Sequence, residues 1–358
     1  MKIGISGLPK SGKTTIFNAL TKLEADTSLY DQKSEPNLGT VQVFDERIKH
    51  LSDIYKPKST IYANIEFIDF PAMAEDSQDH QFLSSNSMTL LKNTDALAIV
   101  LRNFADTILD ETYHKADPVK DFKAIYEQFI LSDLISAEKR LEKIELGYKR
   151  GIKTPALQLE ESVLKRIIET LNEIKPISSI ELNDDEQKSI RGFQFLSLKP
   201  ILIVLNSDEN NLFQNDNVIN ELKNFGEYIE FAGKFEMELG KLDEEEAKMF
   251  MDDMNIKDSA INVFIKAAYA TLGLISFFTV GTDEVRAWTI NKGDPAIEAA
   301  GKIHSDLARG FIRAETFNYN DFKTYGSEKA IREKGLFRLE GKTYIVQDGD
   351  IINVRFNV

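Results

Sequence analysis

The chain has 358 residues, of which 42% are hydrophobic and 28% are charged, a composition typical of a soluble globular protein with two or three domains. The absence of cysteine excludes disulfides and thiol redox chemistry, and no apolar run is long enough to span a membrane. The net charge of −14 argues against indiscriminate binding to nucleic-acid phosphates, and no signal-like segment is seen, so we expect a cytoplasmic protein with neither a membrane partner nor a sequence-specific DNA partner.

A glycine-rich loop follows a short apolar stretch at residues 2–6 and leads into a helix-like stretch at residues 14–20. Strand, loop and helix in this order, with the spacing Gly-x-x-x-x-Gly-Lys-Thr, predict a phosphate-binding loop. The two glycines allow backbone N–H groups to turn toward phosphate oxygens, and the helix N-terminus adds a partial positive charge. The predicted nucleotide-binding residues of this loop are Gly7, Leu8, Pro9, Lys10, Ser11, Gly12, Lys13, Thr14 and Thr15.

Two residues of the loop carry predictable chemistry. Lys13 is expected to reach the β- and γ-phosphates of a nucleoside triphosphate. Thr14 is expected to ligate Mg²⁺ through its hydroxyl group. The sequence therefore predicts a nucleotide as ligand and Mg²⁺ as cofactor.

Residues 1 to about 112 alternate strand-like and helix-like segments. A strand is expected at residues 65–69, where it ends in Asp69, and a continuous apolar run at residues 96–101 is typical of a central parallel strand. The first part of the chain is therefore predicted to be an α/β domain with a parallel-rich sheet.

Helical periodicity replaces this alternation after Pro118. Apolar residues recur at helical spacing through residues 119–149 and again through residues 155–174, with a glycine-containing break between them. Two long charged helices joined by a short break predict an antiparallel coiled-coil hairpin, and two ordinary helices packed on the domain core are the alternative. An apolar strand at residues 199–206 resumes the α/β pattern, so the helical part is an insertion.

The C-terminal segment has the pattern of a small mixed domain. Strand-like residues 278–281 and 285–290 predict one β-hairpin, and residues 339–346, with a turn at Glu340-Gly341, predict another. A last strand is expected at residues 351–358. The predicted domains are a discontinuous nucleotide-binding domain at residues 1–117 and 194–275, a helical insertion at residues 118–193 and a C-terminal domain at residues 276–358.

The strand at residues 199–206 ends in Asn206, at the sheet edge where open parallel sheets bind ligands. GTPases of the translation-factor class carry Asn-Lys-x-Asp at the equivalent point, and the Asp binds guanine. Here Ser207 stands at the Lys position and Glu209 at the Asp position. The longer side chain of Glu209 places the carboxylate wrongly for guanine. The pattern favours a base site that does not select guanine, and a polar turn at a strand end is the alternative.

These motifs and several longer runs resemble the Obg-like ATPases, also called the YchF family. The runs are residues 35–39, 192–196, 284–290, 299–304, 309–315 and 346–350. The resemblance covers essentially the whole chain, with the motifs in the family's order. It implies a P-loop NTPase fold with an inserted coiled coil and a C-terminal ubiquitin-like TGS-type α+β domain, and it implies the ribosome or ribosomal RNA as a partner.

The resemblance also implies a preference for ATP over GTP, because the family's base motif is Asn-x-x-Glu. By this resemblance Asn206, Ser207 and Glu209 would contact the base. The segment that stands where relatives have Ser-Ala-Lys would assist them, and it consists of Ala232, Gly233 and Lys234.

The chain departs from the family at positions that bear on hydrolysis. Lys10 stands where relatives usually carry an Asn that, in potassium-activated members, helps to hold a monovalent cation. Lys33 stands in place of the switch I Thr, and the second switch, which starts at Asp69, has no glycine as far as Phe82. Asp69 itself is retained, and the resemblance implies that it holds Mg²⁺ through water. The histidine that replaces the usual catalytic Gln in the family matches His114.

We therefore expect a slowly hydrolysing ATPase in which Lys13 and His114 are the catalytic residues and which acts as a ribosome-associated or RNA-associated switch. Two alternatives stay open. One is a nucleotide-binding scaffold with little or no hydrolysis, because both switch segments are altered. The other is a GTPase with relaxed base choice. The altered switches indicate a divergent paralogue.

Overall fold

The computed structural model describes residues 1–23, 25, 36–70, 85–112, 114–253 and 259–357. Its contacts divide the chain into two compact units. The first contains residues 1–39 and 66–263, and the second contains residues 40–65 and 264–358. Among the described residues, no helix is both long and apolar enough to cross a membrane.

The first sheet has the strand order β2-β4-β1-β5-β6-β7. Its strands are β1 (Lys2–Ser6), β2 (Asn37–Val43), β4 (Ala63–Asp69), β5 (Ala96–Asn103), β6 (Ile201–Ser207) and β7 (Glu227–Phe231). Strand β1 pairs in parallel with β4 and β5, and β6 pairs in parallel with β5 and β7. Strands β5 and β6 are apolar almost throughout because both faces of a parallel sheet are covered. The predicted parallel-rich α/β fold is confirmed.

Helices connect these strands and cover the sheet. They are α1 (Lys13–Thr21), α3 (Ser85–Lys92), α4 (Thr107–Thr112), α5 (Pro118–Lys149), α6 (Pro155–Asn172), α7 (Asp184–Ile190), α8 (Asp216–Leu222), α9 (Gly233–Leu239) and α10 (Glu244–Asp253), with α11 (Ala260–Thr271) running into the second unit.

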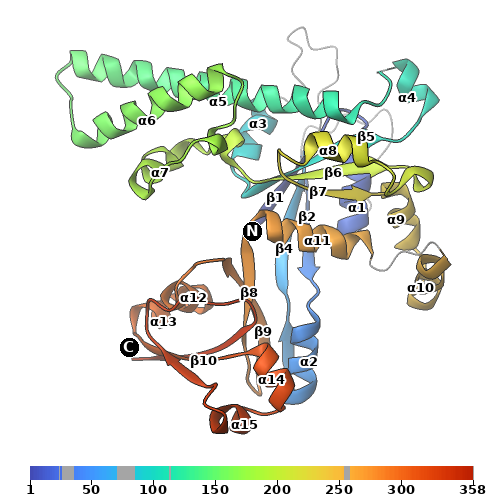
Figure 1. Ribbon diagram of the computed structural model, residues 1–358, viewed down its shortest axis with the longest axis vertical. Helices are drawn as coiled ribbons and strands as arrows, with labels where there is room; N and C mark the ends of the chain where they lie inside the picture. The colour runs from blue at the N-terminus through green and yellow to red at the C-terminus, as the bar shows by residue number, and fades with distance from the viewer. Residues whose placement is uncertain (24, 26–35, 71–84, 113, 254–258, 358) are drawn as a thin grey trace. The chain divides into compact units, whose positions relative to one another are not determined.

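Helices α5 and α6 form the helical insertion, and Figure 1 shows α6 lying alongside α5. The side chain of Asp117 caps α5, with Pro118 at its first position, so the helix begins where the sequence changes character. Phe122 and Phe129 of α5 belong to the same hydrophobic cluster as the sheet residues of β5, and Val163 of α6 joins that cluster. The insertion is thus a pair of helices whose apolar core continues into the core of the nucleotide unit.

The second sheet has the order β11-β10-β12-β8-β9-β3. Its strands are β3 (Ser59–Ile61), β8 (Leu274–Thr279), β9 (Glu284–Asn291), β10 (Phe311–Asn318), β11 (Arg338–Glu340) and β12 (Asp350–Phe356). The helices of this unit are α2 (Glu46–Tyr55), α12 (Ala296–Ile303), α13 (Ser305–Arg309), α14 (Tyr319–Tyr325) and α15 (Glu328–Glu333). The predicted hairpin of β8 and β9 is confirmed by their antiparallel pairing.

The hairpin predicted at residues 339–346 is wrong. Strand β11 pairs instead with β10, where Leu339 lies opposite Glu315. The segment after the turn is held elsewhere, because the hydroxyl of Tyr344 donates to the buried carboxylate of Asp350 at 2.7 Å and Ile345 bridges to Pro295. The hydrogen bond from Tyr344 to a buried acceptor therefore forms in place of local strand pairing.

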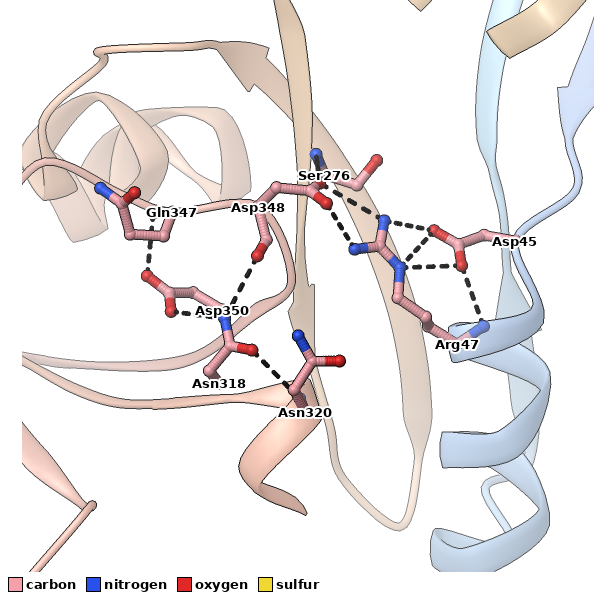
Figure 2. Close-up of polar contacts among 8 residues, drawn as sticks. All are labelled: Asp45, Arg47, Ser276, Asn318, Asn320, Gln347, Asp348 and Asp350. Atoms are coloured by element: carbon pink, nitrogen blue, oxygen red, sulfur yellow. Dashed lines mark hydrogen bonds and ion pairs between the residues drawn. The ribbon is translucent and has the colours of Figure 1, made fainter. Parts of the chain in front are cut away.

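Residues 40–65, which the sequence suggested belong to the nucleotide-binding domain, are part of the second unit. Strand β3 pairs in parallel with β9, and α2 presents Arg47 to the loop before β12 (Figure 2). The guanidinium of Arg47 donates to Asp45 and, through Nη1, to Oδ2 of Asp348 at 2.7 Å. It also lies 5.0 Å from the ring centroid of Phe278, and Asp348 accepts from the backbone N–H of Ser276. Arg47 thus links residues 40–65 to the C-terminal segment of the same unit.

Replacing Arg47 with Met should lower the free energy of unfolding of the second unit by about 1–2 kcal/mol, because Asp45 and Asp348 lose their shared cation. The single tryptophan, Trp288, lies in β9, so urea unfolding followed by its fluorescence reports on this unit. The control is Lys58→Met, which breaks a pair with Asp283 whose side chains are both 81% exposed. That change should cost less than about 0.5 kcal/mol. Equal effects of the two substitutions would contradict the special role of Arg47.

Candidate nucleotide-binding site

The phosphate-loop segment passes from the end of β1 into α1, which begins at Lys13. Gly12 has a φ of 93°, and a Cβ there would lie 2.1 Å from the side-chain amide nitrogen of Asn206. A Cβ at Gly7 would lie 2.4 Å from the carbonyl oxygen of Val100. Both positions therefore require glycine because of close packing, against the side chain of Asn206 at Gly12 and against the backbone of Val100 at Gly7.

Lys13 lies inside the loop and is 7% exposed. Its Nζ donates to the carbonyl oxygens of Gly7 at 3.1 Å and Leu8 at 2.8 Å. Burial lowers the pKa of Lys13 to about 8, with the charge of Lys10 adding to the effect and Asp69 opposing it. The ammonium group is thus partly desolvated and folded back on the loop, where phosphate oxygens would be better partners.

Thr14 and Asp69 lie together, as Mg²⁺ binding requires. The hydroxyl of Thr14 donates to Oδ2 of Asp69 at 2.8 Å, and the amide of Asn37 donates to the same oxygen at 3.1 Å. Asp69 is 3% exposed, and among the described residues its other oxygen, Oδ1, is buried without a hydrogen-bond partner. Burial raises the pKa of Asp69. A buried carboxylate oxygen beside a hydroxyl is a donor set that fits Mg²⁺, which prefers oxygen ligands.

Asn37 was missed as a site residue in the sequence analysis. The sequence placed it in the motif at residues 35–39, but only the fold brings the first residue of β2 to the end of β4. Its position just after the first switch segment is the sequence feature that could have identified Asn37 as a site residue.

The side chain of Asn206 connects the phosphate loop to the predicted base segment. Its Nδ2 donates to the carbonyl oxygen of Ser11 at 2.9 Å, and its Oδ1 accepts from the backbone N–H of Gly233 at 3.1 Å. The residue is 5% exposed. The predicted base segment at residues 232–234 therefore lies beside the phosphate loop. Within it Ala232 and Gly233 are buried, whereas Lys234 is exposed.

Ser207 and Glu209 differ in their surroundings. The hydroxyl of buried Ser207 accepts a hydrogen bond from the side-chain amide of Asn103 at 2.9 Å, and the side-chain amide of Asn215 lies 3.4 Å from it. This hydroxyl therefore has hydrogen-bond partners within the protein. Glu209 is exposed at the start of a short 3-10 helix, Glu209–Asn211, after β6. Asn103 and Asn215 are further polar residues of this sheet edge that sequence reasoning missed, because neither belongs to a motif.

His114 lies beside the phosphate loop. A small cavity there is lined by Leu8, Pro9, Lys10, Ser11, Arg102, Leu109, His114 and Asp121. The Nε2 of His114 is 2.9 Å from Oδ1 of Asp121, and Arg102 donates to the carbonyl oxygen of His114. Lys10, in the same lining, has a left-handed backbone with a φ of 60°. The cavity thus brings His114 close to residues of the phosphate loop.

The altered switch positions lie outside the described residues. These are Lys33 in the first switch and residues 71–82 in the second, Ala72 among them.

Nucleotide affinity should weaken as the pH rises above about 8. Lys13 is cationic below this pH and neutral above it in the free protein, whereas bound phosphates favour the cation, so binding should take up protons. The measurement is calorimetric titration with nucleotide between about pH 7 and pH 9 in buffers of different ionisation enthalpy, where affinity should fall by up to about tenfold per pH unit. The control Lys13→Met should bind weakly and without this pH dependence. A flat affinity in the unmodified protein, without proton uptake, would refute the assignment.

Comparison with known proteins places these features in a family. The family model YchF-GTPase_C, described as a protein of unknown function, matches residues 274–357, and MMR_HSR1, described as a 50S ribosome-binding GTPase, matches residues 2–132. The ribosome-binding ATPase YchF of Bacillus subtilis strain 168 is 37% identical over 364 residues, with 99% of each chain covered. The protein of that name from Buchnera aphidicola subsp. Acyrthosiphon pisum is 39% identical over 361 residues, covering 100% of this chain and 99% of the relative.

A solved structure agrees with the sequence relatives. The Schizosaccharomyces pombe YchF GTPase superposes with a TM-score of 0.84 at 30% identity, covering 99% of this chain and 97% of its own. Similarity over the full length, together with the phosphate loop described above, leads to one conclusion. The chain belongs to the YchF family of P-loop NTPases.

Proposed function

We propose that this protein binds ATP with Mg²⁺, hydrolyses it slowly and acts in the cytoplasm as a ribosome-associated switch. The observation that carries the proposal is the pairing of Thr14 with Asp69 beside the buried ammonium of Lys13. The relatives named ribosome-binding ATPases, similar over their full length, support ATP as the nucleotide and the ribosome as the partner.

The phosphate chemistry follows from three side chains. On nucleotide binding, Lys13 would leave the carbonyl oxygens of Gly7 and Leu8 and bind the β- and γ-phosphates, while backbone N–H groups of the loop would bind the remaining oxygens. Thr14 and Asp69 would hold Mg²⁺, directly or through water. When bound, Mg²⁺ neutralises charge on the phosphate oxygens.

The base would lie at the carboxyl end of β6. Asn206 fixes the phosphate loop against Gly233, and the exposed carboxylate of Glu209 is free to read the base edge. Ser207, Ala232 and Lys234 complete the proposed base site. A Glu in place of the guanine-binding Asp favours adenine.

His114 is the proposed group that acts on the attacking water. Its place in the lining of a cavity that also includes Leu8 to Ser11 supports this role, because a general base must lie near the reacting phosphate. The helical insertion at residues 118–193 and the C-terminal domain at residues 276–358 would report the nucleotide state to the ribosome.

Two alternatives follow from specific residues. Lys33 and Ala72, at the positions where relatives have the switch I Thr and the switch II Gly, favour a nucleotide-binding scaffold without useful turnover. Ser207 and Glu209 replace the Lys and the Asp of the guanine motif, so the other alternative, a GTPase, would have relaxed base choice.

Competition binding between ATP and GTP, followed by single-turnover phosphate release with and without ribosomes, tests the proposal. We expect tighter binding of ATP and faster release with ribosomes, and a loss of about 10²-fold or more in release for His114→Ala at unchanged ATP affinity. ATP binding with no release in either condition would establish the scaffold. Equal affinity for the two nucleotides would establish relaxed base choice.

Lys10 is proposed to supply permanently the positive charge that potassium supplies in relatives. Its charge acts on Lys13, so it lies near the phosphate-binding group. Cationic charge beside the bridge between β- and γ-phosphates stabilises the transferring phosphoryl group.

The substitution Lys10→Asn should make hydrolysis potassium-dependent. Asn tolerates the left-handed backbone found at this position, so the change should not strain the loop. Phosphate release is measured in matched potassium and sodium buffers. The unmodified protein should show the same rate in both within about twofold, and Lys10→Asn should be at least about fivefold faster in potassium. Potassium dependence of the unmodified protein would disprove the idea.

A further inference from the structure

Two charged side chains contact His114, one at its imidazole ring and the other at its backbone carbonyl. The ring nitrogen Nε2 is 2.9 Å from Oδ1 of Asp121, a residue in the first turn of α5 that is 5% exposed. The backbone carbonyl accepts from Arg102, which is 4% exposed at the end of β5 and lies 3.1 Å from Asp110. The imidazole is thus fixed in place and in orientation.

The burial of Asp121 calls for a physical explanation, because a carboxylate so far from water is costly unless it has partners. Burial raises the pKa of Asp121, while the hydrogen bond from His114 lowers it. The imidazole is the side chain that compensates this carboxylate directly, with Arg102 contributing at longer range. The pair is therefore arranged like the carboxylate and imidazole of a hydrolase, in which the acid fixes the tautomer of the base.

We propose that Asp121 is a positioning residue that keeps the His114 ring protonated on Nε2 and leaves Nδ1 as the proton acceptor. This inference rests on the proposed role of His114 in ATP hydrolysis. In the step, a water oxygen forms a bond to the γ-phosphorus and the bond from that phosphorus to the bridging oxygen breaks. The electron pair of the broken bond stays on ADP. The water proton passes to Nδ1, and the carboxylate of Asp121 stabilises the resulting imidazolium until the proton leaves to solvent.

Among the described residues, the charged groups near His114 come from several elements. Asp121 and Asp117 come from α5 and its cap, Arg102 from β5, Asp110 from α4 and Lys10 from the phosphate loop. Arg102 is already paired with Asp110, and it contacts the backbone of His114. Asp121 is the carboxylate in hydrogen-bond contact with the ring, so its removal should act on the tautomer specifically.

The test compares Asp121→Asn with Asp117→Asn, which removes a carboxylate four residues earlier. Asn caps a helix as well as Asp does, so the control keeps the start of α5 intact. Long-range ¹H–¹⁵N spectra of the free protein report the tautomer of each of the four histidines, and His114→Gln assigns the signal. We expect the Nε2–H tautomer in the unmodified protein and in Asp117→Asn. In Asp121→Asn the amide can also donate, so both tautomers should be populated.

Activity gives a second readout. Single-turnover hydrolysis should be at least about tenfold slower in Asp121→Asn, with ATP affinity within about twofold of the unmodified protein, whereas Asp117→Asn should keep its rate. An unchanged tautomer or an unchanged rate in Asp121→Asn overturns the inference, as does an equal loss in Asp117→Asn. Full activity of His114→Ala instead removes the catalytic role on which the inference depends, so the two failures are distinguishable.

Discussion

The side-chain amide of Asn206 is the interaction on which the nucleotide site depends. It joins the phosphate loop at Ser11 to the start of α9 at Gly233, and these segments are more than two hundred residues apart in sequence. Position 12 requires glycine because this amide occupies the space that a side chain would need. A single polar residue at the end of a buried strand thus sets the shape of the loop, and Lys13 and Thr14 depend on that shape.

The elements with strong local signals could be predicted from sequence. The apolar runs of β5 and β6 have one stable environment, a covered parallel sheet, and Asp117-Pro118 defines the start of α5 by capping and fixed backbone geometry. The hairpin expected at residues 339–346 failed because Tyr344 has a stronger partner in buried Asp350 than in strand pairing. Partners of this kind are decided by tertiary contacts, which spacing does not encode.

The same contrast applies within the site. Gly7, Lys13 and Thr14 were predictable because their chemistry lies in one short loop. Asn37 and Asp121 were not, because each acts on a residue that the fold brings near, Asp69 in one case and His114 in the other. Residues at conspicuous motifs are therefore positioned by residues whose role depends on tertiary contacts.

The position of strand β2 has a consequence for the coupling between nucleotide binding and partner binding. The strand begins at Asn37, which holds Asp69, and it ends at Val43, two residues before the cap of the helix that carries Arg47. Its first residues belong to one compact unit and its last to the other. Energetic coupling between two sites is reciprocal. A partner that shifts this strand by binding the second unit would therefore change the affinity for nucleotide by the same factor by which nucleotide changes the affinity for the partner.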